Sequence, residues 1–258
     1  MEYQTLKVEQ HSEHVLLVRL DRPQALNALN TQMGRELLEL WTRLAAEPGA
    51  LRCVVLTGAG DRAFCAGADL KERDGMSPAD GQAQHELFER GFMAMMEFPL
   101  PVVAALNGHA FGGGLEIALC CDFIYAAAGA RFALPEVRLG IMPGGGGTQN
   151  LARAVGERRA KELILTGRQF TADEAVAWGV FNRIGTLSDC LETAEAIAAN
   201  APLAVRQAKK SIHYGLQTDL LTGYRFEIEA YNRLVDTDDR REGVRAFNEK
   251  RKPAFKGK

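Results

Sequence analysis

Short apolar runs and longer amphipathic stretches alternate along the first two thirds of the chain. Residues 15–20 and 52–57 are apolar and rich in valine and leucine, and turn residues follow each of them, so both are predicted as strands. Residues 31–46 repeat apolar side chains at helical spacing behind Thr31, which can cap a helix. Further elements are predicted at residues 82–96 (helix), 101–106 (strand) and 122–127 (strand). This repeated strand–turn–helix order indicates an α/β fold with mainly parallel strands.

The last third of the chain has a different pattern, which predicts helices almost throughout. Three helices are predicted, at residues 187–199, 202–214 and 218–236. The second and third carry apolar stripes, with Leu220, Tyr224 and Ile228 as examples. A stripe of this kind belongs either to the chain's own core or to a contact between subunits, and the pattern leaves both interpretations open.

Composition and charge are those of an ordinary globular protein. The 258 residues are 47% apolar and 25% charged, and the net charge of −2 gives no global field that would recruit nucleic acid. Basic residues gather after residue 240, where they form either a solvated tail or a site for an anionic ligand. Five cysteines without metal-site spacing predict free thiols and a cytoplasmic location. No apolar run approaches the length of a membrane span, so no membrane partner is expected.

Two glutamates, each beside a glycine-rich stretch, are the strongest chemical signal. Glu116 follows the glycines at 112–114, and Glu136 precedes those at 144–147. Glu116 lies one helical turn beyond Gly113 in an otherwise apolar helix, so its carboxylate is predicted to be buried. A first-turn glutamate can simply serve the helix dipole. A buried carboxylate, however, is costly unless it is paired or used, which favours acid/base chemistry.

Two backbone amides accompany these carboxylates. Small residues between Cys65 and Asp69 allow a ligand to approach the backbone, where the N–H of Ala68 is a candidate donor. The N–H of Gly113, at the start of a helix, is a second. Two N–H groups that converge on one oxygen form an oxyanion hole, which suits a thioester that becomes an enolate. A tight turn without a ligand is the alternative, and for Cys65 small-residue packing is favoured over a nucleophilic role. The glycine spacing matches neither a P-loop nor a dinucleotide fingerprint.

Taken together, these motifs resemble the crotonase (enoyl-CoA hydratase/isomerase) superfamily. The similarity extends over the whole chain and is carried by Asn27-Ala28-Leu29-Asn30, residues 63–72, Gly112 to Glu116, Pro135-Glu136 and residues 144–149. It implies a spiral of repeated ββα units in residues 1–196. It also implies a C-terminal helical region, residues 197–258, which forms a homotrimer or a dimer of trimers.

The resemblance also implies roles for individual residues. The substrate would be an acyl-CoA thioester whose carbonyl oxygen binds the N–H groups of Ala68 and Gly113. Glu116 would deprotonate water for attack at Cβ, and Glu136 would supply a proton to Cα. Contacts with the CoA part of the substrate would come from Ala66, Asp69, Leu70 and Lys71. No metal or redox cofactor is expected.

Members of this superfamily catalyse several reactions, so the fold alone does not name the reaction. The presence of both glutamates favours hydration of a short-chain 2-enoyl-CoA, and residues 73–89 are expected to border the acyl pocket. Parts of the sequence resemble the 3-methylglutaconyl-CoA hydratases of leucine breakdown instead. An enoyl-CoA isomerase is a further alternative. An RNA-binding protein and a non-catalytic assembly subunit are remote ones, because the net charge and the paired carboxylates argue against them.

Overall fold

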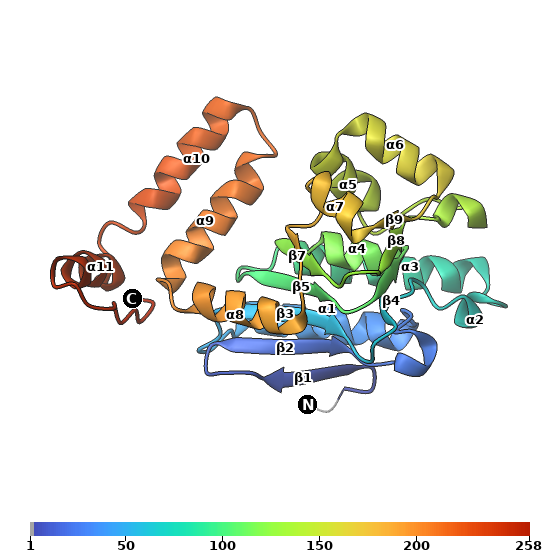
Figure 1. Ribbon diagram of the computed structural model, residues 1–258, viewed down its shortest axis with the longest axis horizontal. Helices are drawn as coiled ribbons and strands as arrows, with labels where there is room; N and C mark the ends of the chain where they lie inside the picture. Colours follow the sequence, from blue (N-terminus) through green and yellow to red (C-terminus); the bar gives the residue numbers. More distant parts are fainter. Residues whose placement is uncertain (1–2) are drawn as a thin grey trace.

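Between residues 53 and 133, successive strands of this chain go alternately to two β-sheets in the computed structural model, which describes residues 3–258 (Figure 1). The strands of the first sheet are β1 (Leu6–Gln10), β2 (Val15–Leu20), β3 (Cys53–Gly58), β5 (Val102–Leu106), β7 (Phe123–Ala126) and β10 (Arg183–Ile184). They follow the order β1-β2-β3-β5-β7-β10, with β1 antiparallel to β2 and all other neighbours parallel. The strands of the second sheet are β4 (Ala63–Cys65), β6 (His109–Phe111), β8 (Arg131–Ala133) and β9 (Phe170–Thr171). Their order is β4-β6-β8-β9, and only β9 is antiparallel to its neighbour.

Each turn of the chain supplies one strand to each sheet and then one or more helices. Thus β3 and β4 precede α2 (Leu70–Arg73) and α3 (Pro78–Met96), and β5 and β6 precede α4 (Gly113–Leu119). The pair β7 and β8 precedes the 3-10 helix η2 (Glu136–Leu139) and then α5 (Gly147–Val155). The predicted α/β spiral of ββα units is therefore confirmed.

The helices before and after this spiral complete the core. They are η1 (Pro23–Ala25), α1 (Thr31–Ala46), α6 (Glu157–Thr166), α7 (Ala172–Ala177) and α8 (Leu187–Ala198). The period of two along β2 divides its side chains between two apolar clusters. Leu16 and Val18 join the larger cluster, which includes residues of α1 and α3, whereas Val15 and Leu17 face α8 on the opposite side of the sheet.

Two predicted helix starts needed correction. The helix at 31–46 is present, but its cap is Asn30, whose Oδ1 accepts from the N–H of Met33 at 3.0 Å. Helix α3 begins at Pro78 and not at residue 82, because Ser77 caps it and proline is well placed in a first turn.

The C-terminal region leaves the core. Helices α9 (Pro202–Gly215) and α10 (Leu220–Asn232) run as a pair that projects from the sheets in Figure 1, and we call this pair the C-terminal arm. A fourth C-terminal helix, α11 (Asp238–Asn248), was not predicted. Asp239, which is buried, accepts from the N–H groups of Lys256 and Gly257 at 2.7 and 2.8 Å, and so fastens the end of the chain. Within residues 3–258, no helix has both the length and the apolar character to cross a membrane.

The apolar stripe on the C-terminal arm is not part of the chain's own core. Leu220 is 85% exposed and Leu221 66% exposed, and Tyr224 and Tyr231 are more than half exposed. The interpretation of this stripe as intramolecular core is therefore wrong.

Gly114 provides a test of how closely α4 packs against β4. A Cβ atom at this position would lie 2.2 Å from the carbonyl oxygen of Cys65, so Gly114→Ala must displace one backbone from the other. We expect the free energy of unfolding to fall by about 3 kcal/mol, measured by chemical denaturation at fixed protein concentration. Gly81→Ala is the matched control. Its Cβ meets no atom within 4 Å on helix α3, so a gain of about 0.5–1 kcal/mol is expected. A Gly114→Ala variant as stable as the wild type would contradict this packing.

Candidate active site

Three segments of the candidate site follow three neighbouring strands of the second sheet. Ala66 to Ala68 follow β4, Gly112 and Gly113 follow β6, and Glu136 comes shortly after β8. These strands are parallel, with Cys65 opposite Ala110 and Phe111 opposite Ala133. Ligand sites of α/β proteins form at the carboxyl ends of parallel strands, and here those ends bring the three segments together.

The backbone pairing leaves the N–H groups of Ala68 and Gly113 available. Ala68 forms an isolated parallel bridge with Leu29, in which Leu29 N–H donates to the oxygen of Gly67 and Asp69 N–H donates to the oxygen of Leu29, both at 2.8 Å. The N–H of Ala68 therefore points to the other side. Gly113 is the first residue of α4, where the helix offers its N–H no acceptor. Within residues 3–258, neither N–H donates to a protein acceptor, and both residues line the same cavity.

Gly67 brings these two turns into contact. Its φ of +94° lies in a region that favours glycine, and a Cβ here would be 2.8 Å from the oxygen of Phe111. The same Cβ would be 3.6 Å from the nitrogen of Gly113. A side chain at residue 67 would therefore separate the two turns that carry the candidate donors.

Glu116 is buried, as predicted, and its carboxylate is held by the backbone. It is 4% exposed, and its Oε1 accepts from the N–H groups of Gly145 and Gly147 at 2.7 and 2.9 Å. Burial raises the pKa of Glu116, and the two amides oppose that rise because they bind the ionised form. The second glycine stretch thus binds the carboxylate of Glu116 through two backbone N–H groups.

Glu136 has a different environment, although it lies near Glu116. It is 8% exposed, and neither of its carboxylate oxygens has a hydrogen-bond partner among the described residues. A Cβ on Gly112 would be 3.1 Å from its Oε1, so the carboxylate lies against the turn that leads to Gly113. Burial raises the pKa of Glu136 to about 7, and the charge of Glu116 adds to the rise. Two carboxyl groups whose environments differ in this way are suited to separate acid and base roles.

Both glutamates and both amides face one cavity of about 1000 Å³. This volume lies at the upper end of the range for small-ligand pockets. Helix α3 forms one wall, where His85, Phe88 and Phe92 line the cavity and His85 Nδ1 lies 2.9 Å from an oxygen of Glu89. Residues 141–146 also line the cavity, and Gly144 and Gly145 lie against His85 and Phe92 of this helix. The region 73–89 that was expected to border the acyl pocket does line this cavity.

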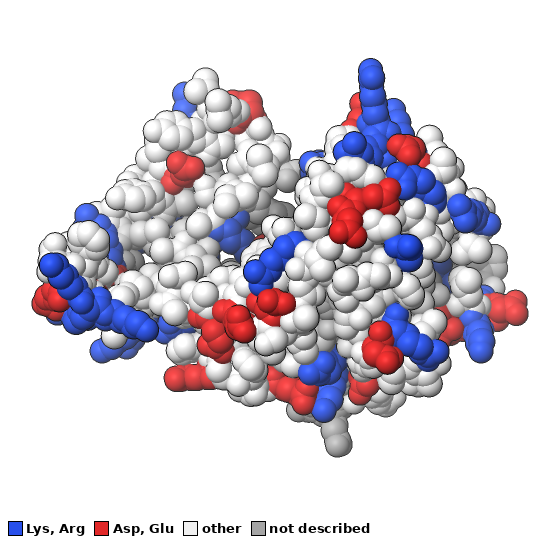
Figure 2. Space-filling view, in the orientation of Figure 1, with Lys and Arg blue, Asp and Glu red and all other residues white. Residues whose placement is uncertain are grey.

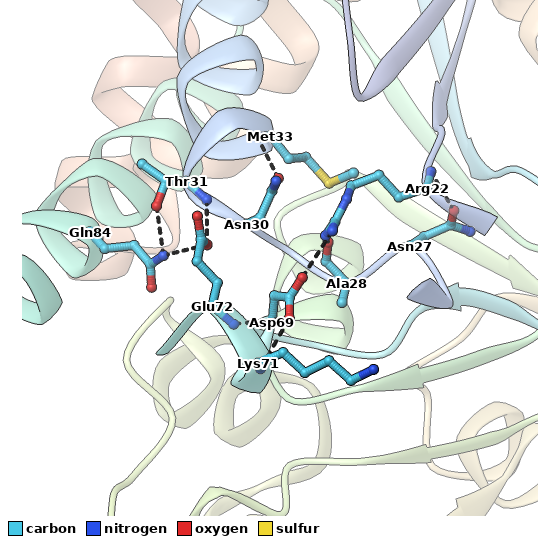
Figure 3. Close-up of polar contacts among 10 residues, drawn as sticks. All are labelled: Arg22, Asn27, Ala28, Asn30, Thr31, Met33, Asp69, Lys71, Glu72 and Gln84. Carbon is cyan, nitrogen blue, oxygen red and sulfur yellow. Dashed lines mark hydrogen bonds and ion pairs between the residues drawn. The ribbon is translucent and has the colours of Figure 1, made fainter. Parts of the chain in front are cut away.

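The residues predicted to contact CoA divide into two groups. Ala66 and Leu70 line the cavity, but Asp69 and Lys71 are not among its lining residues. The carboxylate of Asp69 caps α2 and pairs with Arg22 at 2.9 Å. In Figure 3 the side chain of Lys71 extends away from this pair. The structure therefore gives Asp69 a role in fastening the loop, while the CoA contact of Lys71 stays a prediction.

A polar network fixes the loop that carries Ala68 (Figure 3). Glu72 Oε2 accepts from Thr31 N–H at 2.8 Å and from Gln84 Nε2 at 2.9 Å, and Gln84 also donates to the hydroxyl of Thr31 at 2.8 Å. These contacts join α2 to the start of α1 and to α3. No local sequence pattern predicts these contacts, because the partners are 12 to 53 residues apart along the chain.

Cys65 is fully buried, and burial raises the pKa of its thiol to about 12. A thiol that remains protonated is not a nucleophile at neutral pH. The packing role favoured from the sequence is thus the one that the structure supports.

The high pKa of Glu136 has a consequence for stability. The unfolded carboxyl group ionises near its ordinary value of 4.5, and the folded one near 7, so the unfolded state binds fewer protons between these values. The free energy of unfolding therefore falls as pH rises from 4.5 to 7, and the penalty persists above 7. Glu136→Gln removes this penalty. We expect its stability gain over the wild type to be about 3 kcal/mol larger at pH 8 than at pH 4, measured by denaturation at both pH values. A difference that does not change with pH would contradict the buried, unpaired state of Glu136.

Comparison with known proteins identifies the family. The family described as Enoyl-CoA hydratase/isomerase matches residues 10–258. The short-chain-enoyl-CoA hydratase of Clostridium acetobutylicum is 42% identical over 242 residues, which are 92% of this chain and 92% of that protein. The crotonyl-CoA hydratase of Syntrophomonas wolfei is 38% identical over 259 residues, 99% of each. The crystal structure of enoyl-CoA hydratase from Bacillus anthracis is 43% identical and superposes with a TM-score of 0.96, covering 99% of this chain and 100% of that one. This chain therefore belongs to the enoyl-CoA hydratase/isomerase family.

Proposed function

We propose that this chain is a hydro-lyase that adds water across the 2,3 double bond of a short-chain 2-enoyl-CoA. The observation that carries the proposal is the combination of two buried glutamates, in different environments, with two unpaired amides in the same cavity. Each of these groups has a part in the addition of water to a conjugated thioester.

The amides of Ala68 and Gly113 act on the thioester carbonyl. When the water oxygen bonds to Cβ, the π electrons of the double bond shift toward Cα and the carbonyl oxygen, which becomes an enolate oxygen. Two N–H groups that already point into the cavity stabilise this charge without reorganisation. The substrate's CoA part supplies no chemistry in this step.

The two glutamates move the protons. Glu116, whose ionised form is favoured by the amides of Gly145 and Gly147, accepts a proton from the attacking water. Glu136, whose pKa is about 7, carries a proton in a large fraction of molecules at neutral pH and donates it to Cα. The product gains a hydroxyl group at Cβ and a hydrogen at Cα, and a proton passes back from Glu116 to Glu136 by way of solvent before the next turnover.

The proposal also includes the contacts with CoA and the cellular compartment that were predicted from the sequence. Ala66 and Leu70 contact the CoA thioester at the cavity, with Lys71 near its phosphates. The five free cysteines support a reducing compartment, the cytoplasm.

The C-terminal arm is proposed to join subunits in a homotrimer or a dimer of trimers. Figure 2 shows few charged side chains on the visible face of this arm. A groove of about 530 Å³ runs between α9 and α10, and large apolar side chains such as Ile212 and Tyr224 are exposed beside it. An exposed apolar surface of this kind is typical of an interaction site. The unit proposed for assembly is residues 197–258.

Replacement of either glutamate by its amide tests the proposal. Glu116→Gln and Glu136→Gln keep the shape of the side chain but remove the base or the acid, so each should lower kcat for crotonyl-CoA at least about 100-fold. The measurement is the loss of absorbance of the conjugated thioester as water is added.

Glu192→Gln, an exposed substitution on α8, is the control and should retain wild-type activity. Hydration at wild-type rate by either active-site variant would refute the acid/base assignment. Isomerisation of a 3-enoyl-CoA by a wild-type enzyme that leaves crotonyl-CoA unchanged would assign the site to the isomerases instead.

A further inference from the structure

Arg73 places an unpaired cation in the wall of the cavity. Its side chain lines the cavity, and its Nε donates to Gln84 Oε1 at 2.9 Å. Among the described residues, its terminal nitrogens Nη1 and Nη2 make no hydrogen bond and no ion pair. The proposed hydration does not use this guanidinium group.

The buried side chain of Gln84 fixes the position of Arg73. Gln84 is 3% exposed, and its Nε2 donates to both Thr31 and Glu72, so its Oε1 is directed toward Arg73. Glu72, an acid of the same helix, has its Oε2 occupied by two donors. An arginine that is anchored through Nε and keeps both terminal nitrogens free is preorganised for an anion.

Gln84, which holds Arg73 in place, belongs to the side of the cavity that contains Glu116. Gln84 immediately precedes His85, and a Cβ on Gly144 would lie 2.3 Å from His85 Nε2. The next residue of that loop, Gly145, binds the carboxylate of Glu116. In the proposed reaction Glu116 acts at Cβ, so this wall lies beside the part of the acyl chain beyond the double bond. The other acid on this wall, Glu89, pairs with His85 at 2.9 Å.

We propose that Arg73 binds a carboxylate at the distal end of the acyl group, so that the site accepts 2-enoyl-CoA thioesters that carry a second, free carboxylate. The inference rests on the proposed function, which places the thioester between Ala68 and Gly113. Nη1 and Nη2 can donate two parallel hydrogen bonds to one carboxylate, the geometry that arginine forms best. An acyl group without this carboxylate would leave Arg73 solvated and would gain nothing from it.

Binding of two saturated thioesters tests the proposal without any turnover. Glutaryl-CoA differs from butyryl-CoA by a terminal carboxylate, and neither has a double bond to hydrate. We expect Arg73→Met to raise the Kd of glutaryl-CoA at least about tenfold and that of butyryl-CoA less than about twofold, by calorimetry. Arg73→Lys retains the charge but not the paired N–H donors of the guanidinium group, so it should raise the Kd of glutaryl-CoA by an intermediate factor and leave that of butyryl-CoA unchanged. Arg90→Met removes an exposed cation of α3 outside the cavity and should change neither Kd.

The same variants separate this proposal from the proposed function. Glutaconyl-CoA is crotonyl-CoA with a terminal carboxylate, and Arg73→Met should lower kcat/KM at least about tenfold for glutaconyl-CoA only. A wild type that hydrates neither thioester refutes the proposed function, while the calorimetry still decides the role of Arg73. An equal increase in Kd for glutaryl-CoA and butyryl-CoA, or no increase for either, would overturn the proposal that Arg73 binds a carboxylate. A loss for butyryl-CoA that is absent for butyryl-pantetheine would overturn it as well, because Arg73 would then contact a CoA phosphate.

Discussion

The close approach of three backbone turns at the ends of β4, β6 and β8 is the constraint on which the site depends. A Cβ at Gly114 would lie 2.2 Å from the oxygen of Cys65, and one at Gly67 would lie 2.8 Å from the oxygen of Phe111. Backbone can approach backbone this closely only where side chains are absent. Because the turns touch, the amides of Ala68 and Gly113 face one cavity, and Glu136 lies against the turn at Gly112. The short second sheet thus serves mainly to bring these turns together.

A second close contact, made by the loop at residues 144–147, determines the hydrogen bonds of the Glu116 carboxylate. The loop at residues 144–147 lies between α3 and Glu116, so that a Cβ on Gly145 would be 2.2 Å from Phe92 and 3.0 Å from Glu116 Oε2. This contact delivers two N–H groups to Glu116, whereas Glu136 receives none from the described residues. Burial raises the pKa of both carboxyl groups, and at Glu116 the two N–H groups oppose that rise. In the proposed reaction, this difference in packing suits Glu116 to the role of base and Glu136 to that of acid.

Local patterns along the chain predicted much of this protein. The strands β2, β3, β5 and β7 were predicted from their apolar runs and the helix at 31–46 from its periodicity, whereas β1 and β10 were not predicted. The burial of Glu116 was predicted from its apolar neighbours. The strands β4, β6 and β8 have three residues each, which is too short for any periodicity to show. The highly charged helix α11 carries no broad apolar stripe and was missed for that reason. The ion pair of Asp69 with Arg22 and the hydrogen bond of Arg73 with Gln84 depend on partners in other elements, which no local pattern reveals.

The central claim, that backbone N–H groups stabilise the enolate, can be tested at Gly113 by two substitutions that both add a Cβ, of which only proline also replaces the N–H by a ring carbon. A Cβ at this position meets Leu29 at 3.0 Å in both Gly113→Ala and Gly113→Pro, and proline is tolerated at the first position of a helix. Only Gly113→Pro lacks the N–H. The measurement is kcat/KM for hydration of crotonyl-CoA by the two variants. Gly113→Pro should be at least about 100-fold less active than Gly113→Ala if the N–H of Gly113 stabilises the enolate. Equal activity of the two variants would contradict it.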